Sequence, residues 1–454
     1  MNKASTTLRF FQSICKFNFG IFEKEEFKKF LKMGLIFAFM IGIYWTLRPL
    51  KDAVFIKFVG NLQLPFAKTI SVLALLPLVI FYTKLLEKHS REKMLIILPL
   101  FYSIVMSLFT ILLWNFQGAE GLITKVMGYT FYLFVESFGS LVIALFWAFA
   151  TDSTTAVSAK RGFPLVVAIG QIGGVIFPYS IGGLPHRLGH TSDALSLALL
   201  AVLTFMIIPL VRYFLKSTPK TLLASFQGTK EVKHEAKFLD GLKLLLKNRY
   251  LLGIFGVNFI YEVIITIFDF NFKIAASSVY SGVALTNYLS IYASSVNTVS
   301  LCCLLLGISN ITRFLGVGIA LAAMPVIVGC ALFGFLTINS LSFLFALMVG
   351  SKAINYALNG PALKQLYIPT THDVKFKAQA WIETFGSRTS KQGGSLFNMS
   401  LSPLQSAFGA MAGKSYYLMM SGAVCFPLLV LWFAIAVFLG KSFNNAVKKN
   451  ALIC

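Results

Sequence analysis

The chain has 454 residues, of which 57% are hydrophobic and only 13% are charged, and its mean hydropathy is +0.77. This composition excludes an ordinary soluble globular protein and is typical of a membrane protein with many spans. About twelve helices of ~20–25 residues would use most of the length and leave no room for a sizeable soluble domain. The formal net charge of +23 is spread over short loops and the ends. It therefore indicates attraction to an anionic membrane surface rather than to nucleic acid.

The first 30 residues are basic and aromatic, and they lack the apolar region and cleavage site of a signal peptide. We expect residues 1–30 to form a cytoplasmic amphipathic segment that leads into the first span. Hydrophobic spans follow near residues 31–59, 65–86, 94–114, 126–150, 162–184 and 193–215. The sequence thus predicts an N-terminal six-helix bundle over residues 31–215.

A charged segment, 216–248, then interrupts the hydrophobic pattern and is predicted to be a basic cytoplasmic linker. The next spans lie near 250–273, 284–306, 312–334, 338–358, 376–400 and 416–440. They predict a C-terminal six-helix bundle over residues 249–441, followed by a cytoplasmic tail, 442–454. The expected fold is an all-α polytopic membrane protein with about twelve transmembrane helices in two six-helix halves, as in carriers of the major-facilitator type.

Basic residues are concentrated in alternate loops, which gives the expected orientation. Besides the linker, the basic loops carry Lys84, Lys88, Arg91, Lys93, Lys160, Arg161, Lys364, Lys375 and Lys377. Because cytoplasmic loops are enriched in Lys and Arg, both termini and the linker are predicted to be cytoplasmic. Lys160 and Arg161 lie at the cytoplasmic mouth of the fifth span. They are either snorkelling anchors or a funnel for anions.

Charged residues inside the first span are the most informative feature of the sequence. The stretch YWTLRPLKD, from Tyr44 to Asp52, places Arg48, Lys51 and Asp52 within an apolar run. Each such charge costs roughly 2.5–3.5 kcal/mol at the centre of a membrane helix. Tyr44, Arg48 and Asp52 follow one helical face, which we expect to line the interior of the bundle. Arg48 and Asp52 can pair locally, whereas Lys51 has no opposite charge three or four residues away.

Three further spans carry similar polar stripes. The fourth carries Tyr132, Glu136, Ser140 and Trp147, the seventh Asn258, Glu262, Asp269 and Lys273, and the eleventh Thr384, Arg388, Lys391 and Ser395. Narrow polar stripes on apolar helices predict that their charges converge on one central cavity. Like Lys51, the charges of Glu136, Glu262 and Lys391 lack a local partner. A polyanionic substrate is one candidate partner for the cations.

The segments around these charges resemble a known family. They read TLRPLKDAVF at 46–55, ESFGSLVIALFWAFATD at 136–152, AKRGFPL at 159–165, NFIYEVIITIFDFNFK at 258–273, LKQLYIP at 363–369 and KFKAQAWIETFGSRTSKQGGSLFN at 375–398. The chain is similar in these segments to the non-mitochondrial ATP/ADP translocases, the nucleotide transporters of plastids and intracellular bacteria. The resemblance implies import of nucleotides, commonly ATP in exchange for ADP. By motif position it assigns transport roles to Lys51, Glu136, Glu262 and Lys391.

The resemblance and the charges together predict a binding site without a cofactor or metal. Lys51 and Lys391, helped by Arg48 and Arg388, are the expected phosphate ligands. Glu136 and Glu262, with Asp269, are expected to balance these cations or to take up a proton. The base is expected near an aromatic ring, for which Tyr44, Tyr132, Trp147 and Tyr261 are candidates, with Asn258 as a further substrate contact. We expect a monomer in the inner membrane of an intracellular bacterium, with a nucleotide and the lipid bilayer as partners and no nucleic acid.

Two alternatives stay open at this point. The chain departs from the family pattern at Ser137, Phe138, Gln365, Ala378 and Gln379, which leaves room for proton-coupled uptake of other nucleotides or of NAD. A membrane-embedded enzyme or a lipid flippase is the alternative from another class. It is disfavoured because the sequence shows no cluster of residues typical of a catalytic metal or nucleophile, and we predict that the protein is not an enzyme.

Overall fold

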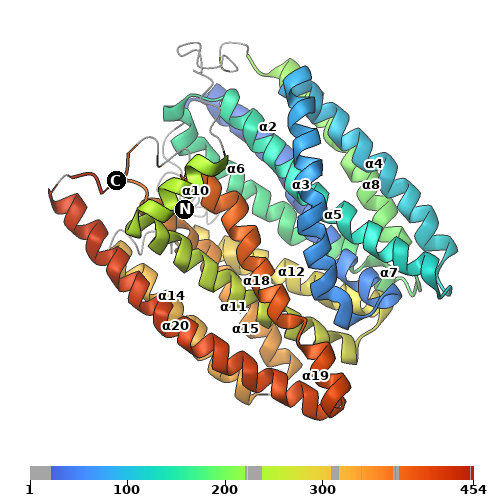
Figure 1. Ribbon diagram of the computed structural model, residues 1–454. Helices are drawn as coiled ribbons and strands as arrows, with labels where there is room; N and C mark the ends of the chain where they lie inside the picture. Colours follow the sequence, from blue (N-terminus) through green and yellow to red (C-terminus); the bar gives the residue numbers. More distant parts are fainter. Residues whose placement is uncertain are drawn as a thin grey trace, which may run out of the picture. The chain divides into compact units, whose positions relative to one another are not determined.

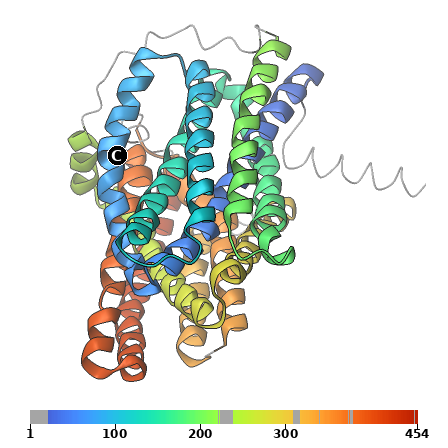
Figure 2. The same ribbon diagram turned by 90° about the vertical axis from the view of Figure 1, so that its right-hand side faces the viewer.

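The computed structural model describes residues 22–219, 222, 238–307, 316–338, 340–371, 374, 378–449 and 451–453. Within these ranges every regular element is a helix and no strand is present (Figures 1 and 2). In the part of the chain that the structure describes, eleven helical segments are long and apolar enough to cross a membrane. The expected all-α polytopic fold is therefore confirmed. The predicted segment 1–30 lies mostly outside the described residues.

The eleventh predicted span, near 376–400, is not among these eleven segments, because its helices are short and polar. It consists of α17 (Gln379–Trp381), the π-helical turn η6 (Ile382–Gly386) and α18 (Ser387–Asn398). These elements follow one another without a break, but α18 carries Arg388, Lys391 and several hydroxyl and amide side chains. A helix with so many polar groups is suited to line an aqueous or polar interior rather than to face lipid.

The described chain divides into two compact units. Unit 1 comprises residues up to 60, 73–232 and 279–305. Its helices are α2 (Lys24–Phe58), most of α3 (Leu64–Lys88), α4 (Arg91–Asn115), α5 (Leu122–Asp152), α6 (Ala156–Phe177), η2 (Pro178–Gly182), α7 (Leu184–Arg187), α8 (Ala194–Ser217) and α12 (Gly282–Leu305).

Helix α2 is the centre of unit 1. It packs along α6 and also contacts α5, α8 and α12, while α4 packs against α8 (Figure 1). Fully buried apolar side chains such as Met40 and Leu47 of α2 and Phe131 and Phe146 of α5 form its core. Pro49 removes one backbone hydrogen bond from α2 next to Arg48 and Lys51. The charged stretch of the first span therefore lies on the most enclosed helix of this unit.

Small residues allow α2 and α6 to approach closely. A Cβ atom on Gly173 of α6 would lie 2.0 Å from the backbone oxygen of Ala38 on α2. A Cβ atom on Gly42 of α2 would likewise lie 2.9 Å from the backbone oxygen of Gly173. Such contacts between small residues are a common way to pack membrane helices. We call this contact line the α2–α6 seam.

Unit 2 comprises residues 61–72, 233–278 and 306–454. Its helices are η1 (Asn61–Gln63), the start of α3, α10 (Phe238–Lys247), α11 (Arg249–Val279), α14 (Val317–Thr337), α15 (Leu341–Ile354), η4 (Asn355–Asn359), α16 (Gly360–Gln365), α17, η6, α18, α19 (Leu401–Phe408) and α20 (Ala410–Lys449).

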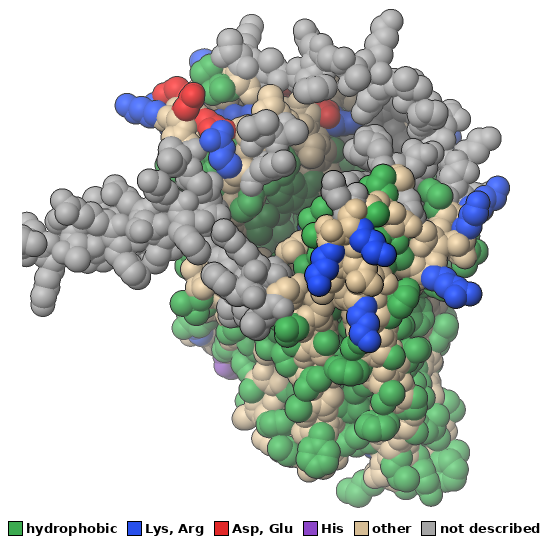
Figure 3. All heavy atoms as spheres, turned by 90° about the vertical axis from the view of Figure 1, so that its left-hand side faces the viewer, with side chains coloured by type: hydrophobic (Ala, Val, Ile, Leu, Met, Phe, Trp, Pro, Cys, Tyr) green, Lys and Arg blue, Asp and Glu red, His purple; other side chains and the backbone are tan. Residues whose placement is uncertain are grey.

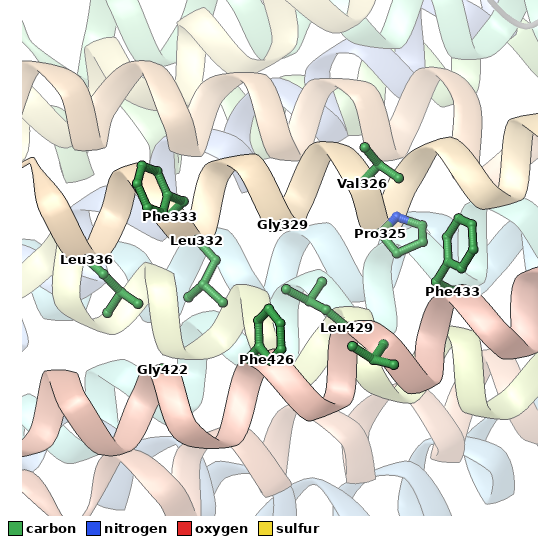
Figure 4. Close-up of a pocket in the computed structure, with 11 residues that line it drawn as sticks. Pro325, Val326, Gly329, Leu332, Phe333, Leu336, Gly422, Phe426, Leu429 and Phe433 are labelled. Carbon is green, nitrogen blue, oxygen red and sulfur yellow. The ribbon is translucent and has the colours of Figure 1, made fainter.

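An apolar groove of about 450 Å³ lies between α14 and α20 in unit 2. Figure 4 shows Leu332 and Phe333 of α14 and Phe426, Leu429 and Phe433 of α20 around it. Phe333 and Phe426 are largely exposed, as expected for side chains that face lipid. On the face shown in Figure 3, hydrophobic side chains form a broad area below a group of Lys and Arg side chains. Such a broad hydrophobic surface is typical of a protein embedded in lipid.

The two units do not coincide with the continuous ranges 31–215 and 249–441. Residues 279–305 group with unit 1 because α12 packs against α2 and α6. Residues 61–72 group with unit 2, where Asn61 donates a hydrogen bond to Ser277 of α11 at 3.0 Å. The order of the spans in the sequence does not show that these two segments belong to the other unit. The predicted bundles, linker and tail stay predictions.

Candidate functional site

Lys51 of α2 and Glu136 of α5 form an ion pair in unit 1. The Lys51 ammonium donates a hydrogen bond to Glu136 Oε1 and lies 3.7 Å from Asp52 Oδ1. The Lys51 side chain is only 4% exposed, whereas that of Glu136 is 33% exposed. A buried cation needs such a carboxylate, because its desolvation would otherwise cost several kcal/mol. The sequence identified both charges but not that they are each other's partner.

The aromatic ring of Tyr132 contacts the Lys51 ammonium group of this pair. The Lys51 Nζ atom lies 4.1 Å from the centroid of the Tyr132 ring, and Phe55 packs against the ring at 5.3 Å between centroids. Tyr132 is 1% exposed and lies one helical turn before Glu136. A cation over an aromatic face is stabilised by the ring quadrupole. The Tyr132 ring therefore stabilises the Lys51 ammonium group, and because the ring is buried it leaves no exposed face on which a base could stack.

Arg48 lies over two aromatic rings of its own helix. Its guanidinium is 5.0 Å from the ring of Trp45 and 5.6 Å from that of Tyr44. Tyr44 packs against Gly139 of α5, where a Cβ atom would lie 2.2 Å from the tyrosine ring. Tyr44 and Arg48 are both half-buried. Among the predicted aromatic residues, Tyr44 is thus the one that remains partly accessible next to a cation.

Trp147, the third predicted aromatic, belongs to an aromatic cluster. Its ring lies 5.1 Å from Phe37 of α2, 5.3 Å from Phe163 of α6 and 5.5 Å from Phe146. These edge-on contacts join α2, α5 and α6. The ring is half-buried, and its surroundings indicate packing between helices.

Lys391 of α18 and Glu262 of α11 form the corresponding pair in unit 2. Lys391 Nζ lies 3.6 Å from Glu262 Oε1, which also accepts a hydrogen bond from Ser387 at 3.2 Å. Here the lysine is the accessible partner: its side chain is 55% exposed, and that of Glu262 is 16% exposed. Asn258, one turn before Glu262, and Arg388, one turn before Lys391, are half-buried.

Asp269 of α11 binds three lysines from three helices. Its carboxylate lies 2.6 Å from Lys273, four residues along α11, 2.8 Å from Lys352 of α15 and 3.6 Å from Lys68 at the start of α3. Sequence reasoning named Asp269 and Lys273 but missed Lys68 and Lys352. Both could have been identified by the feature that singled out Lys51, namely a lysine inside a predicted hydrophobic span.

Arg161 connects two helices of unit 1. Its Nη2 atom lies 3.1 Å from Glu26 Oε1 and 3.2 Å from Glu26 Oε2, and Ser158 also donates to this carboxylate. Glu26 is 7% exposed, so this contact ties the beginning of α6 to the beginning of α2. This ion pair gives Arg161 a structural role, and the role of Lys160 and Arg161 as a funnel or as anchors stays a prediction. The side chain of Lys160 lies outside the described residues.

The predicted charges thus form one Lys–Glu pair in each unit. Their convergence on one cavity stays a prediction, because the pairs belong to different units. Among the residues that the structure describes, no group of three or more His, Cys, Asp or Glu side chains is placed to hold a metal ion.

A protein-family model and several named proteins match the chain over most of its length. The model of the family described as TLC ATP/ADP transporter matches residues 4–125 and 113–443. The chain is 24% identical to ADP,ATP carrier protein 1 of Rickettsia prowazekii (strain Madrid E), over 94% of this chain and 96% of the relative. It is 23% identical to the chloroplastic ADP,ATP carrier protein 2 of Arabidopsis thaliana, over 96% of this chain and 77% of the relative.

Solved structures of secondary transporters share the fold. The nucleoside transporter NupG matches with a TM-score of 0.62 at 12% identity, over 90% of this chain and 98% of that one. A bacterial homologue of the human lysosomal transporter Spinster, inward-facing and unoccupied, matches with a TM-score of 0.60 at 14% identity, over 94% and 99%. These likenesses confirm the major-facilitator-type fold. With the family model matched along nearly the whole sequence, the resemblance of the charged segments is confirmed and the chain belongs to the TLC ATP/ADP transporter family.

Proposed function

We propose that this chain is a secondary transporter that imports ATP in exchange for ADP across a bacterial inner membrane by alternating access. The main observation behind the proposal is that each unit contains one ion pair between two helices. These are Lys51 with Glu136 in unit 1 and Lys391 with Glu262 in unit 2. The proposal is supported by the family and by relatives named as ADP,ATP carriers. A transporter of this type needs no catalytic residue, and we propose that it functions as a monomer with cytoplasmic termini.

The ion pairs suit a substrate with several negative charges. Transfer of nucleotide phosphates through a low-dielectric bundle requires cations at close range. Each lysine can exchange its carboxylate partner for a phosphate oxygen, so each ammonium group has an anionic partner with and without substrate. Arg48 and Arg388 would add bidentate donors for phosphate. In the empty carrier, Glu136 and Glu262 keep the cations neutralised.

The base has a candidate neighbour in unit 1. Tyr44 is half-buried and carries the Arg48 guanidinium against one face. We propose that the adenine stacks beside Tyr44 and Arg48, while the phosphates bind the lysines. Tyr132 is a weaker candidate, because Lys51 and Phe55 already contact its ring.

Transport by purified protein in liposomes tests the proposal. Vesicles loaded with ADP should take up labelled ATP, and vesicles without internal nucleotide should take up far less. Lys51→Ala or Lys391→Ala should reduce exchange roughly ten- to a hundredfold, the value of one or two charge-assisted hydrogen bonds. Lys125→Ala, which changes an exposed lysine at the start of α5, is the matched control and should exchange normally.

The same vesicles separate exchange from the alternatives. Uptake that is indifferent to internal nucleotide but collapses with a protonophore would reject exchange and favour proton-coupled import. Normal exchange by Lys51→Ala would remove the proposed role of the Lys51–Glu136 pair.

A further inference from the structure

The Asp269 cluster of unit 2 is rich in positive charge. It brings the ammonium groups of Lys68, Lys273 and Lys352 within 3.6 Å of one carboxylate. These side chains are mostly withdrawn from solvent: Asp269 is 10% exposed, Lys273 9%, Lys352 11% and Lys68 24%. Several cations held together in a poorly hydrated site are costly unless anions accompany them.

The surrounding helices contribute cations but few carboxylates. Glu262 and Asp269 are the acidic residues of α11, and the segment 61–72, α15 and α18 contain no Asp or Glu. The same segments contribute the cationic residues Lys68, Lys273, Lys352, Arg388 and Lys391, besides Arg249 at the start of α11. Lys352 of α15 and Lys68 of α3 tie other helices to α11, whereas Lys273 lies on α11 itself, four residues after Asp269. Three ammonium groups around one carboxylate give these four side chains a formal charge of +2, and this excess favours an additional anionic group.

The cluster lies on the same surface as the Lys391–Glu262 pair. Glu262 and Asp269 are seven residues apart on α11, which places them on one helical face and about 10 Å apart along the axis. Gln392, next to Lys391, donates a hydrogen bond to Thr69, next to Lys68, at 2.6 Å. One polar surface of unit 2 therefore carries both the Lys391–Glu262 pair and the Asp269 cluster.

We propose that Lys68, Lys273 and Lys352 form a second subsite for a phosphate group of the substrate. Asp269 holds the three ammonium groups together while the subsite is empty. Lys68 is the most exposed and lies farthest from the carboxylate, so it is the first to turn toward the ligand. The identification of this ligand as a nucleotide rests on the proposed function, whereas the subsite itself requires only a polyphosphate chain.

Binding to the purified full-length protein tests the subsite. The ligands are ATP, ADP and inorganic tripolyphosphate, and the readouts are the dissociation constant and the unfolding temperature in detergent. The wild-type protein should bind ATP and tripolyphosphate. Lys68→Gln should weaken both by roughly tenfold, the value of one charge-assisted hydrogen bond, and Lys68→Arg should restore most of the affinity. Lys441→Gln, at an exposed lysine of α20 in the same unit, should bind as the wild type does.

A purely structural role for the cluster makes a different prediction. Lys68→Gln or Lys352→Gln would then lower the unfolding temperature of the ligand-free protein and leave the affinity of the folded protein unchanged, which would overturn the proposal. So would a wild-type protein that does not bind tripolyphosphate. If tripolyphosphate binds and depends on Lys68 but ATP does not bind, the subsite stands and the proposed nucleotide exchange fails. If ATP binds equally to all variants, the exchange proposal survives and the subsite is wrong.

Discussion

The buried ammonium of Lys51 depends on groups from two helices. Glu136 accepts its hydrogen bond, and the Tyr132 ring lies on its other side. Removal of one partner from a buried pair usually costs more than removal of both, because a lone charge stays without compensation. The pair can therefore be dissected into a structural and a transport contribution.

We predict that Glu136→Gln lowers the free energy of unfolding by about 1–3 kcal/mol, since Lys51 would lose its closest carboxylate while Glu136 is partly solvated in the wild type. The double variant Lys51→Met/Glu136→Gln should recover much of this loss but not transport. Thermal unfolding and ATP–ADP exchange of the single and double variants measure the two effects. Additive losses of stability in the double variant would show that the two side chains do not interact.

Asp193, which precedes α8, gives unit 1 a titratable group near neutral pH. It is 6% exposed and accepts a hydrogen bond from Thr286 of α12 at 3.0 Å. Burial raises the pKa of Asp193 to about 6, although the Thr286 hydrogen bond and the charge of Lys57 lower it. An aspartate in an unfolded chain has a pKa of about 3.9. The folded protein therefore binds an extra proton between about pH 4 and pH 6, and its stability falls as the pH rises through this window.

We predict that Asp193→Asn removes this dependence. The wild type should be more stable at about pH 5 than at about pH 7.5, by up to about 3 kcal/mol, and the asparagine variant should lose the difference because it carries no buried charge. Unfolding temperatures of both proteins at the two pH values provide the measurement. A variant with an unchanged pH dependence would assign the titration to another group.

At the scale of elements, the α2–α6 seam is the tightest contact of unit 1. We predict that Gly173→Ala destabilises the protein by roughly 1–3 kcal/mol or more, because the added methyl group meets the backbone of Ala38 rather than a movable side chain. Gly350→Ala on α15 is the matched control. Nothing lies within 4 Å of its Cβ position, and alanine favours a helix by about 1 kcal/mol over glycine. Detergent-solubilised yield and unfolding temperature should fall for the first variant and stay equal or rise for the second.

Most helices could be predicted from the sequence, because long apolar runs identify spans directly. The predicted fourth span, 126–150, lies within α5, and the predicted first span nearly matches the apolar part of α2. The predicted eleventh span, 376–400, includes α18, but the π-helical turn that precedes α18 carries no such signal in the sequence. Charged residues could be recognised one by one, but not the pairing of Lys51 with Glu136. That contact depends on which helices are neighbours, and periodicity within a single helix carries no such information.

At the scale of the whole molecule, the alternation of basic loops predicts one orientation. In a variant without native cysteines, a single cysteine at His89, between α3 and α4, should react with an impermeant thiol reagent only from the cytoplasmic side. A cysteine at Gly118, between α4 and α5, should react from the outer side. Intact cells and inverted membrane vesicles provide the two sides. The reverse labelling pattern would place both termini outside.

The two lysines of the Lys–Glu pairs differ in how much of each side chain solvent can reach, and this difference has a consequence in time. Lys391 is 55% exposed and Lys51 only 4%. An arriving anion meets an accessible charge first and must displace other groups to reach a buried one. We therefore expect neutralisation of Lys391 to slow the capture of substrate and to weaken its dependence on salt. Neutralisation of Lys51 should leave capture fast and shorten the residence of the bound substrate. Substrate binding would then occur in two steps: a fast association with Lys391, followed by slower binding at Lys51.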